Sequence, residues 1–329
     1  MDWGSILSNV VRAAVGEFSI VFALAAIGLN IHFGYTGLLN FGQVGFMSAG
    51  AFGLAIGVTY FGLSFWVSLL VALGAAVALA LLLGFPTLRL RADYLAIVTI
   101  AASEILRFIL RSPSTRDVTG GSYGLTRFAR GFYDVNPIPP GDYGFGPFMY
   151  SANRLWLLAI GWALVVIASL SVWLTMRSPW GRVLKAIREE EDAATSLGKS
   201  VYSYKMQSLI YGGVIGALGG LVLAVSTQSV QPDVYSTPIT FYAYLALILG
   251  GTARVLGPVL GSMVFWMILA LTDNVLRQAI RAGHIPEAIM TGTQVGQVRF
   301  MLVGLGLMFL MIFRPQGIIG DRREMELDG

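Results

Sequence analysis

The chain has 329 residues, of which 56% are hydrophobic and only 12% are charged, and its formal net charge is +4. A soluble domain carries about 25% charged residues, so this composition excludes an ordinary soluble protein and predicts a polytopic membrane protein. The absence of cysteine excludes disulfides and thiol chemistry, the distant His32 and His284 make no metal-binding pattern, and no long basic run predicts nucleic-acid binding.

In chain order, the first 18 residues lack the features of a cleavable signal and predict a short interfacial helix. Apolar runs of about 20 residues then predict about nine membrane-crossing helices. These lie at 16–34, 40–62, 63–84, 92–110, 154–176, 206–227, 241–253, 257–276 and 299–313. The seventh is short and Gly-rich at its end, which predicts a broken or re-entrant helix buried in protein. The expected fold is all-α, a single transmembrane bundle over residues 1–329.

The loop 177–205 contains all three lysines of the chain and several arginines. Because basic residues concentrate in cytoplasmic loops, we place this loop in the cytoplasm. Counting spans outward from it then places the loops 111–153 and 277–298 outside and the tail 314–329 in the cytoplasm. The long loop 111–153 carries four arginines, but long loops cross membranes regardless of charge.

Small residues recur every four positions in two of the expected membrane helices. Residues of this size at this spacing let helix backbones approach closely, so the pattern predicts a compact bundle. One stripe comprises Gly45, Ala49, Gly53 and Gly57, and the other comprises Gly212, Gly216 and Gly220.

The stretch AATSLGKS, residues 193–200, satisfies a loose form of the phosphate-binding loop. A working loop needs a strand before it and glycines that let backbone N–H groups turn toward phosphates. Here Ala193 replaces the first glycine, and the preceding GRVLKAIREEED predicts a charged helix with Lys185/Glu189 and Arg188/Asp192 at the i,i+4 spacing. We therefore expect no ATP site in this stretch.

The same residues fit a docking helix better. Asp192, Ala193, Ala194 and then Gly198 form a variant of the E-A-A-x-x-x-G signature of bacterial ABC-importer permeases, with Asp192 in place of the usual Glu. Gly198 is expected to cap the helix. In that family the helix docks into a groove on a separate ATPase subunit, and a mixed-charge helix suits such a surface. A solvated loop whose charges only fix topology remains the alternative.

The resemblance extends from about residue 20 to about residue 320. The stretch GYTGLLNFGQVGFMSAGAFG (34–53) is similar to the N-terminal signature of branched-chain amino acid ABC permeases of the LivM type. Five further stretches follow in the family's order: SEILRF (103–108), TGGSYGL (119–125), SPWGRVLKAIREEEDAATSLG (178–198), GGTARVLGPVLGS (250–262) and FRPQGIIG (313–320). Together these motifs are specific for the family, whereas any one of them alone is weak.

The resemblance implies the permease subunit of an ABC importer in a bacterial or archaeal plasma membrane. The chain itself is then not an enzyme and binds no cofactor, since ATP and Mg belong to two partner ATPase subunits. A second permease, expected to be a paralogue, and an external substrate-binding protein complete the complex. The expected substrate is a branched-chain or other hydrophobic amino acid. Urea, short amides and aromatic acids remain alternatives.

Two sets of residues carry these expectations. The ATPase-coupling set is Arg182, Lys185, Arg188, Glu189, Asp192, Ala193, Ala194 and Gly198. The translocation-path set is Asn40, Gln43, Glu104, Arg107, Gly120 and Gly121.

Each member of the path set has a structural alternative. Asn40 and Gln43, two amides in an apolar segment, either line the path or bridge neighbouring helices. Glu104 and Arg107 form either an outer gate or a structural ion pair. Gly120 and Gly121 form either the entrance of the path or a plain turn. A stand-alone secondary transporter would instead need an acidic residue at a broken mid-membrane helix, for which Glu104 is the one candidate.

Overall fold

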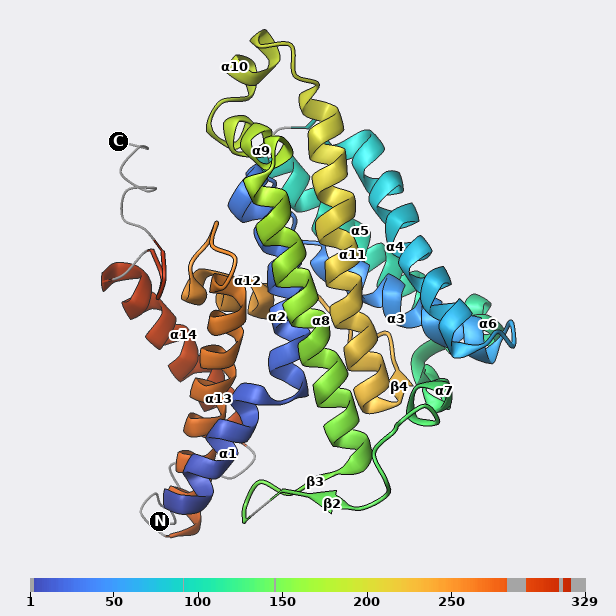
Figure 1. Ribbon diagram of the computed structural model, residues 1–329, viewed down its shortest axis with the longest axis vertical. Coiled ribbons are helices and arrows are strands. Elements are labelled where there is room, and N and C mark those ends of the chain that lie inside the picture. The colour runs from blue at the N-terminus through green and yellow to red at the C-terminus, as the bar shows by residue number, and fades with distance from the viewer. Residues whose placement is uncertain (1–2, 91, 145, 283–293, 314–315, 321–329) are drawn as a thin grey trace.

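The computed structural model describes residues 3–90, 92–144, 146–282, 294–313 and 316–320. Its regular structure is almost entirely helical (Figure 1), which confirms the predicted helical class. The main helices are α1 (Trp3–Val15), α2 (Glu17–Leu29), the π-helix η1 (Asn30–Tyr35), α3 (Gln43–Thr59), α4 (Phe65–Thr87), α5 (Ala92–Arg111), α8 (Ala152–Arg177), α9 (Pro179–Glu189), α10 (Glu191–Ser196), α11 (Val201–Thr227), α12 (Pro238–Gly250), α13 (Gly257–Arg281) and α14 (Val295–Phe313).

The segment predicted as an external loop at 111–153 holds only short elements. Strand β1 (Leu125–Thr126) pairs antiparallel with β4 (Ser229–Val230), and β2 (Asp142–Tyr143) pairs with β3 (Tyr150–Ser151). The pairing of β1 with β4 ties this segment to the end of α11. The remaining elements are η2 (Pro113–Thr115), α6 (Arg116–Thr119), η3 (Gly121–Tyr123) and α7 (Arg130–Tyr133).

Every one of the predicted membrane segments falls on a helix. Among the described residues, five helical runs are long and apolar enough to cross a membrane: Trp3–Tyr35, α4, α8, α11 and α13. Helices α3 and α12 are shorter, with 17 and 13 residues, so the segment predicted at 40–62 is helical only from Gln43 to Thr59. The chain is therefore a multi-pass helical membrane protein. Half of the predicted loop 277–298 and most of the tail 314–329 lie outside the described residues.

Helix α2 occupies the centre of the bundle, in contact with α8, α11, α12 and α13. Its residues from Ser19 to Leu29 are all buried, and a helix that is apolar on every side is suited to the inside of a bundle. Helix α1 packs along α13. Helices α9 and α10 lie at one end of the long axis, and α1 and the β2–β3 hairpin lie at the other end (Figure 1).

The stripe on α3 lies where helix backbones approach each other closely. A Cβ added to Gly53 would lie 2.8 Å from Ala72 of α4, and one added to Gly57 would lie 2.6 Å from the Ser68 hydroxyl. Gly45, one turn or more before them, faces α5 instead. Ala49 of the same stripe is half-buried. Small residues therefore set the distance between α3 and its two neighbours.

The stripe on α11, formed by Gly212, Gly216 and Gly220, faces α2 and α3. A Cβ on Gly216 would overlap the Gln43 side chain, and one on Gly220 would overlap the backbone of Met47. These glycines let α11 lie against both central helices at once.

The predicted broken helix corresponds to α12, which ends at Gly250 and is followed by a loop at 251–256 that reverses the chain. Helix α13 then packs back along α12. The reversal needs unusual backbone angles, with φ of +111° at Gly251 and +57° at Ala253. Gly251 is buried and a side-chain amide from η1 hydrogen-bonds the turn, as described below, whereas residues 252–255 are half-buried and Leu256 is exposed.

Candidate functional site

The charged stretch predicted as one helix forms two. Glu190, with φ of −155° and ψ of 109°, is extended and separates α9 from α10. The predicted i,i+4 pair of Arg188 with Asp192 on one helix is therefore wrong. The physical reason is the run of acidic residues: negative charge is unfavourable at the carboxyl end of α9 but favourable at Glu191 and Asp192, in the first turn of α10.

Gly198 ends α10, as the sequence predicts. Its φ is +75°, its N–H donates to the Thr195 carbonyl at 2.9 Å, and the Lys199 N–H donates to the Ala194 carbonyl at 3.2 Å. This is the Schellman pattern that closes many helices. The stretch AATSLGKS thus begins inside α10 and ends just before α11, with helical residues rather than a strand before it.

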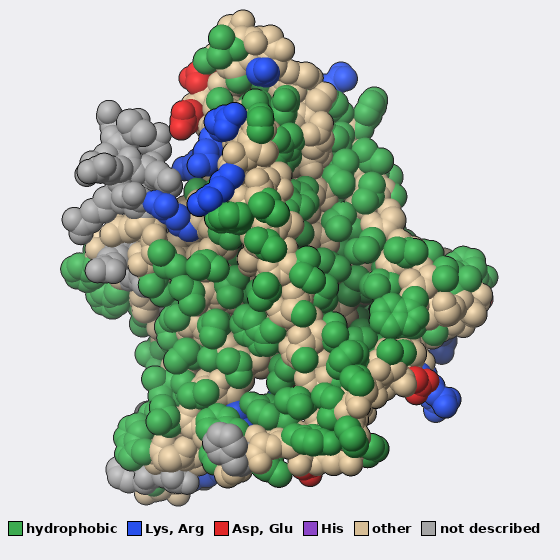
Figure 2. Space-filling view, in the orientation of Figure 1, with side chains coloured by type: hydrophobic (Ala, Val, Ile, Leu, Met, Phe, Trp, Pro, Cys, Tyr) green, Lys and Arg blue, Asp and Glu red, His purple; other side chains and the backbone are tan. Residues whose placement is uncertain are grey.

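Helix α9 presents one face to the bundle and the other to the outside. Leu184 and Ile187 of α9 are buried, with 0% and 1% exposure. In α10 only Ala194 is buried. The remaining coupling residues that the sequence predicts, Arg182, Lys185, Arg188, Glu189, Asp192, Ala193 and Gly198, are exposed. Lys and Arg side chains gather at this end of the molecule with acidic side chains beside them (Figure 2).

Leu197, at the tip beyond α10, is 78% exposed. Sequence reasoning missed this residue because one leucine after a polar helix carries no periodic signal. Single exposed apolar side chains are common on protein surfaces, but this one is at the tip of the charged segment, where another protein could contact it.

Arg188 is exposed along part of its length but its end points back to the bundle. Its Nη1 donates to the Gly34 carbonyl oxygen at 2.6 Å. Its backbone and side chain also lie over Gly37, where a Cβ would be 3.4 Å from the Arg188 Cγ, and Gly37 has a φ of +74°. Because Gly34 belongs to η1, Arg188 connects α9 to the segment that continues the central helix.

Two further contacts hold the α9–α10 segment on α11. Trp180 Nε1 donates to Gln207 Oε1 at 2.7 Å. Lys205, which is 8% exposed, forms an ion pair with Glu191 of α10. The segment is therefore attached to the bundle at both helices, although most of its surface is free.

The π-helix η1 connects this attachment to the turn between α12 and α13. Asn30 Nδ2 donates to the Arg254 carbonyl at 2.9 Å, and Asn30 Oδ1 accepts from the Ala253 N–H at 2.8 Å. Asn30 is 1% exposed. Single π-turns often occur at functional positions, and this one contacts α9 through Gly34 and the α12–α13 turn through Asn30.

The buried amides of the path set form a hydrogen-bonded network. Asn40 Nδ2 donates to Gln43 Oε1 at 3.2 Å and to His32 Nδ1 at 3.1 Å, so His32 carries its proton on Nε2 and donates to the Leu209 carbonyl at 3.2 Å. Gln43 Nε2 donates to the Gly212 carbonyl at 3.3 Å. The geometry supports the helix-bridging alternative for Asn40 and Gln43, and their role in lining a path stays a prediction.

The acid–base pair of α5 is part of a larger cluster. Arg107 contacts Glu104 at 2.7 Å and Asp233 at 2.9 Å, and Arg111 contacts Asp233 at 3.2 Å. The Thr237 hydroxyl and N–H both donate to Glu104 Oε1. This cluster joins α5 to the segment before α12. Sequence reasoning missed Asp233 because it is distant in sequence, and the ion-pair alternative describes the geometry.

The glycines of TGGSYG form a turn. Gly120, Gly121 and Gly124 have φ of +76°, +58° and +71°, values that residues with a Cβ rarely adopt. The turn directs the chain into β1, beside β4. A role at a path entrance stays a prediction for Gly120 and Gly121.

Residues 13–312 match the family model described as the branched-chain amino acid transport system permease component. The high-affinity branched-chain amino acid transport system permease protein LivM of Escherichia coli is 30% identical, over 93% of this chain and 69% of that protein. A probable LivM of Methanocaldococcus jannaschii is 25% identical over 92% and 91%, and the nucleoside ABC transporter permease NupC of Lactococcus lactis is 23% identical over 85% and 86%. The chain belongs to the family of branched-chain amino acid permease components, as its motifs predict.

Proposed function

We propose that this chain is the membrane-spanning permease subunit of an ABC importer for branched-chain or other hydrophobic amino acids. The observation that carries the proposal is the α9–α10 segment, in a chain of this family. It is short, charged with both signs, exposed and placed at one end of the bundle. Such a segment suits docking to a separate protein, because complementary charges steer association.

In this proposal the α9–α10 segment and the carboxyl terminus face the cytoplasm of a bacterial or archaeal cell. Two ATPase subunits bind ATP and Mg and dock on this segment, with Leu197 as the apolar anchor. The opposite end receives an external substrate-binding protein. A second permease subunit, a paralogue, completes the pathway.

Alternating access then needs a route from the docking segment to the bundle. Movement of α9 pulls on η1 through the bond from Arg188 to Gly34. The same η1 holds the α12–α13 turn through Asn30. Helices α2 and α11 are packed backbone to backbone, so they transmit this movement as stiff bodies.

Uptake of labelled leucine by proteoliposomes tests the function. The vesicles hold this chain with the permease, ATPases and binding protein encoded beside it, with or without ATP on the ATPase side. Leucine uptake that requires ATP supports both class and substrate. ATPase activity stimulated by the binding protein with urea, an amide, an aromatic acid or a nucleoside, without leucine uptake, moves the substrate to that solute. Leucine uptake that is the same with and without ATP would overturn the proposal.

The coupling assignment has its own test in the same vesicles. Reversing two outward charges, Lys185→Glu with Asp192→Lys, is expected to lower ATP-driven uptake at least about tenfold, since a charge pair in a docked interface contributes more than 1.4 kcal/mol. The matched control reverses Arg130 and Asp134, an exposed pair formed by α7 and the residue that follows it. Because we place the binding protein at that end, the variants are also compared by the amount of ATPase that co-purifies with each, and equal amounts would remove the assignment.

A further inference from the structure

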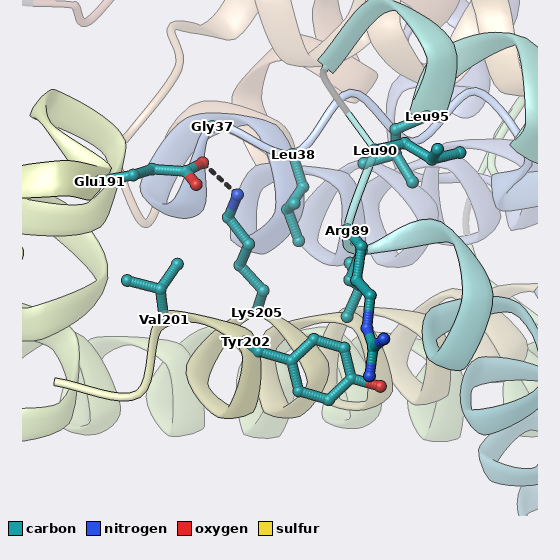
Figure 3. Close-up of a pocket in the computed structure, with 10 residues that line it drawn as sticks. Gly37, Leu38, Arg89, Leu90, Leu95, Glu191, Val201, Tyr202 and Lys205 are labelled. Atoms are coloured by element: carbon teal, nitrogen blue, oxygen red, sulfur yellow. Dashed lines mark hydrogen bonds and ion pairs between the residues drawn. The ribbon is translucent and has the colours of Figure 1, made fainter. Parts of the chain in front are cut away.

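A cavity of about 550 Å³ lies between the α10–α11 corner and the turn that joins α4 to α5 (Figure 3). Arg89 from the turn and Tyr202 and Lys205 from α11 line it, together with Glu191 of α10 and several leucines. It is separate from the outward face of α9–α10, where we place the ATPases.

The charges in this cavity do not balance. Lys205 is neutralised by Glu191, to which Figure 3 shows it pointing. Within the described part of the chain, Arg89 has no carboxylate partner. Its guanidinium carbon lies 5.7 Å from the centre of the Tyr202 ring and 6.0 Å from that of Phe85. The lining described for the cavity therefore carries one uncompensated positive charge, which lies beside two aromatic rings.

The Tyr202 hydroxyl gives a second, independent indication. Its oxygen is buried and has no hydrogen-bond partner among the described residues. Buried hydroxyls are nearly always hydrogen-bonded, so a group without a partner needs an explanation. An unpaired guanidinium beside an unpaired hydroxyl suits an anion with several oxygens, such as a phosphodiester.

The surroundings indicate which kind of anion. Phe85 on α4 is 69% exposed, and Leu82 one turn before it is 71% exposed. Tyr94 and Ile97 on α5 are 61% and 64% exposed. These side chains lie on the two helices that flank the cavity, and the centre of the Phe85 ring is 6.0 Å from the Arg89 guanidinium carbon. Helix α4 is apolar and long enough to cross a membrane, so its exposed side chains would face acyl chains beside the cavity. A soluble anion would contact only the charged residues of the cavity, whereas a phospholipid would contact these residues with its headgroup and the apolar side chains with its acyl chains.

We propose that this cavity binds the anionic headgroup of a phospholipid from the cytoplasmic leaflet, with Arg89 and Tyr202 as its ligands. The proposal rests on the orientation given under the proposed function. Basic pockets between membrane helices on the cytoplasmic side bind such headgroups.

The test uses the full chain purified with its partner subunits in neutral detergent. Its thermal unfolding is measured while dioleoyl phosphatidylglycerol, dioleoyl phosphatidylcholine or inorganic phosphate is added. We expect phosphatidylglycerol alone to raise Tm. Arg89→Gln weakens the apparent affinity about fivefold, the equivalent of about 1 kcal/mol per basic residue at a membrane surface. Tyr202→Phe also weakens it, without lowering Tm in the absence of lipid.

The matched control is Arg177→Gln. Arg177 also lies over an aromatic ring, that of Trp173 at 4.0 Å, and is at the same end of the molecule, but it does not line the cavity. Equal effects of the two lipids, or equal losses from Arg89→Gln and Arg177→Gln, would overturn the proposal. An Arg89-dependent shift with inorganic phosphate equal to that with phosphatidylglycerol would replace the lipid by a soluble anion. Since Tm is read without transport, failure of leucine uptake leaves this result interpretable.

Discussion

Around α2, glycines bring helix backbones into contact, whereas α9 buries only one face and most side chains of α10 are exposed. Gln43, in the first region, has 0% exposure and hydrogen-bonds a neighbouring helix. The second region is attached through a few side chains, chiefly Arg188, Trp180 and Lys205. In the function that we propose, this difference lets one chain serve two purposes: the tightly packed core moves as one body, and the exposed surface of the docking segment is available to a partner.

The largest expected effect lies in the core. Gly220→Ala places a Cβ against the backbone of Met47, which cannot move away as a flexible side chain would. We expect a loss of about 3 kcal/mol or more, the upper range for overpacking. The measurement is the yield and Tm of the purified protein in detergent.

Gly74→Ala is the matched control, because a Cβ there meets nothing within 4 Å on α4. Alanine is the better helix former by about 0.5–1 kcal/mol, so this variant is expected to be slightly more stable. If both variants behaved alike, the contrast between a tightly packed core and the rest of the bundle would be wrong.

An intermediate effect is expected where the two regions meet. Arg188→Gln removes a charged hydrogen bond to the Gly34 carbonyl, which contributes about 1.5–3 kcal/mol. We expect the variant to bind its ATPases but to lose most ATP-driven uptake, because the bond connects α9 to η1. Binding is measured by co-purification and uptake in proteoliposomes.

Arg182→Gln serves as the control for charge, since Arg182 is on the same helix and exposed. We expect this variant to bind its ATPases more weakly, whereas the complexes that do form should show normal ATP-driven uptake. Loss of ATPase binding in Arg188→Gln would place this residue in the docking surface, as the sequence alone suggests.

Much of the fold follows from patterns that the sequence displays directly. Apolar runs predict the helices because the bilayer requires backbone groups to bond within each segment. The four-residue spacing of Gly212, Gly216 and Gly220 predicts a face of close contact, and Gly198 predicts a cap. Each of these features is specified by residues that are close together in the sequence, so a local sequence pattern predicts it.

The sequence does not reveal features that depend on distant partners. The sequence predicts that Arg188 points outward, but its guanidinium points inward and hydrogen-bonds the carbonyl of Gly34, which is 154 positions away. Asn30 and the π-helix around it carry no periodic signal, since the bonds from Asn30 go to the α12–α13 turn. For the break at Glu190, two local sequence signals disagree. The acidic residues around it disfavour one continuous helix, whereas the i,i+4 charge spacing on both sides predicts a continuous helix.

The smallest expected effect concerns the cap of the docking segment. Gly198 has a φ of +75° and open space around it, so Gly198→Ala strains the backbone by about 1 kcal/mol without any collision. Gly62, between α3 and α4, has a φ of +64° and equally open space, which makes Gly62→Ala a matched control. Both variants should lower Tm slightly and by similar amounts. Only Gly198→Ala should lower ATP-driven uptake, by about the fivefold that 1 kcal/mol allows, because α10 must keep its shape to dock. Equal uptake in the two variants would show that the form of α10 does not matter for coupling, and the docking surface would then belong to α9 alone.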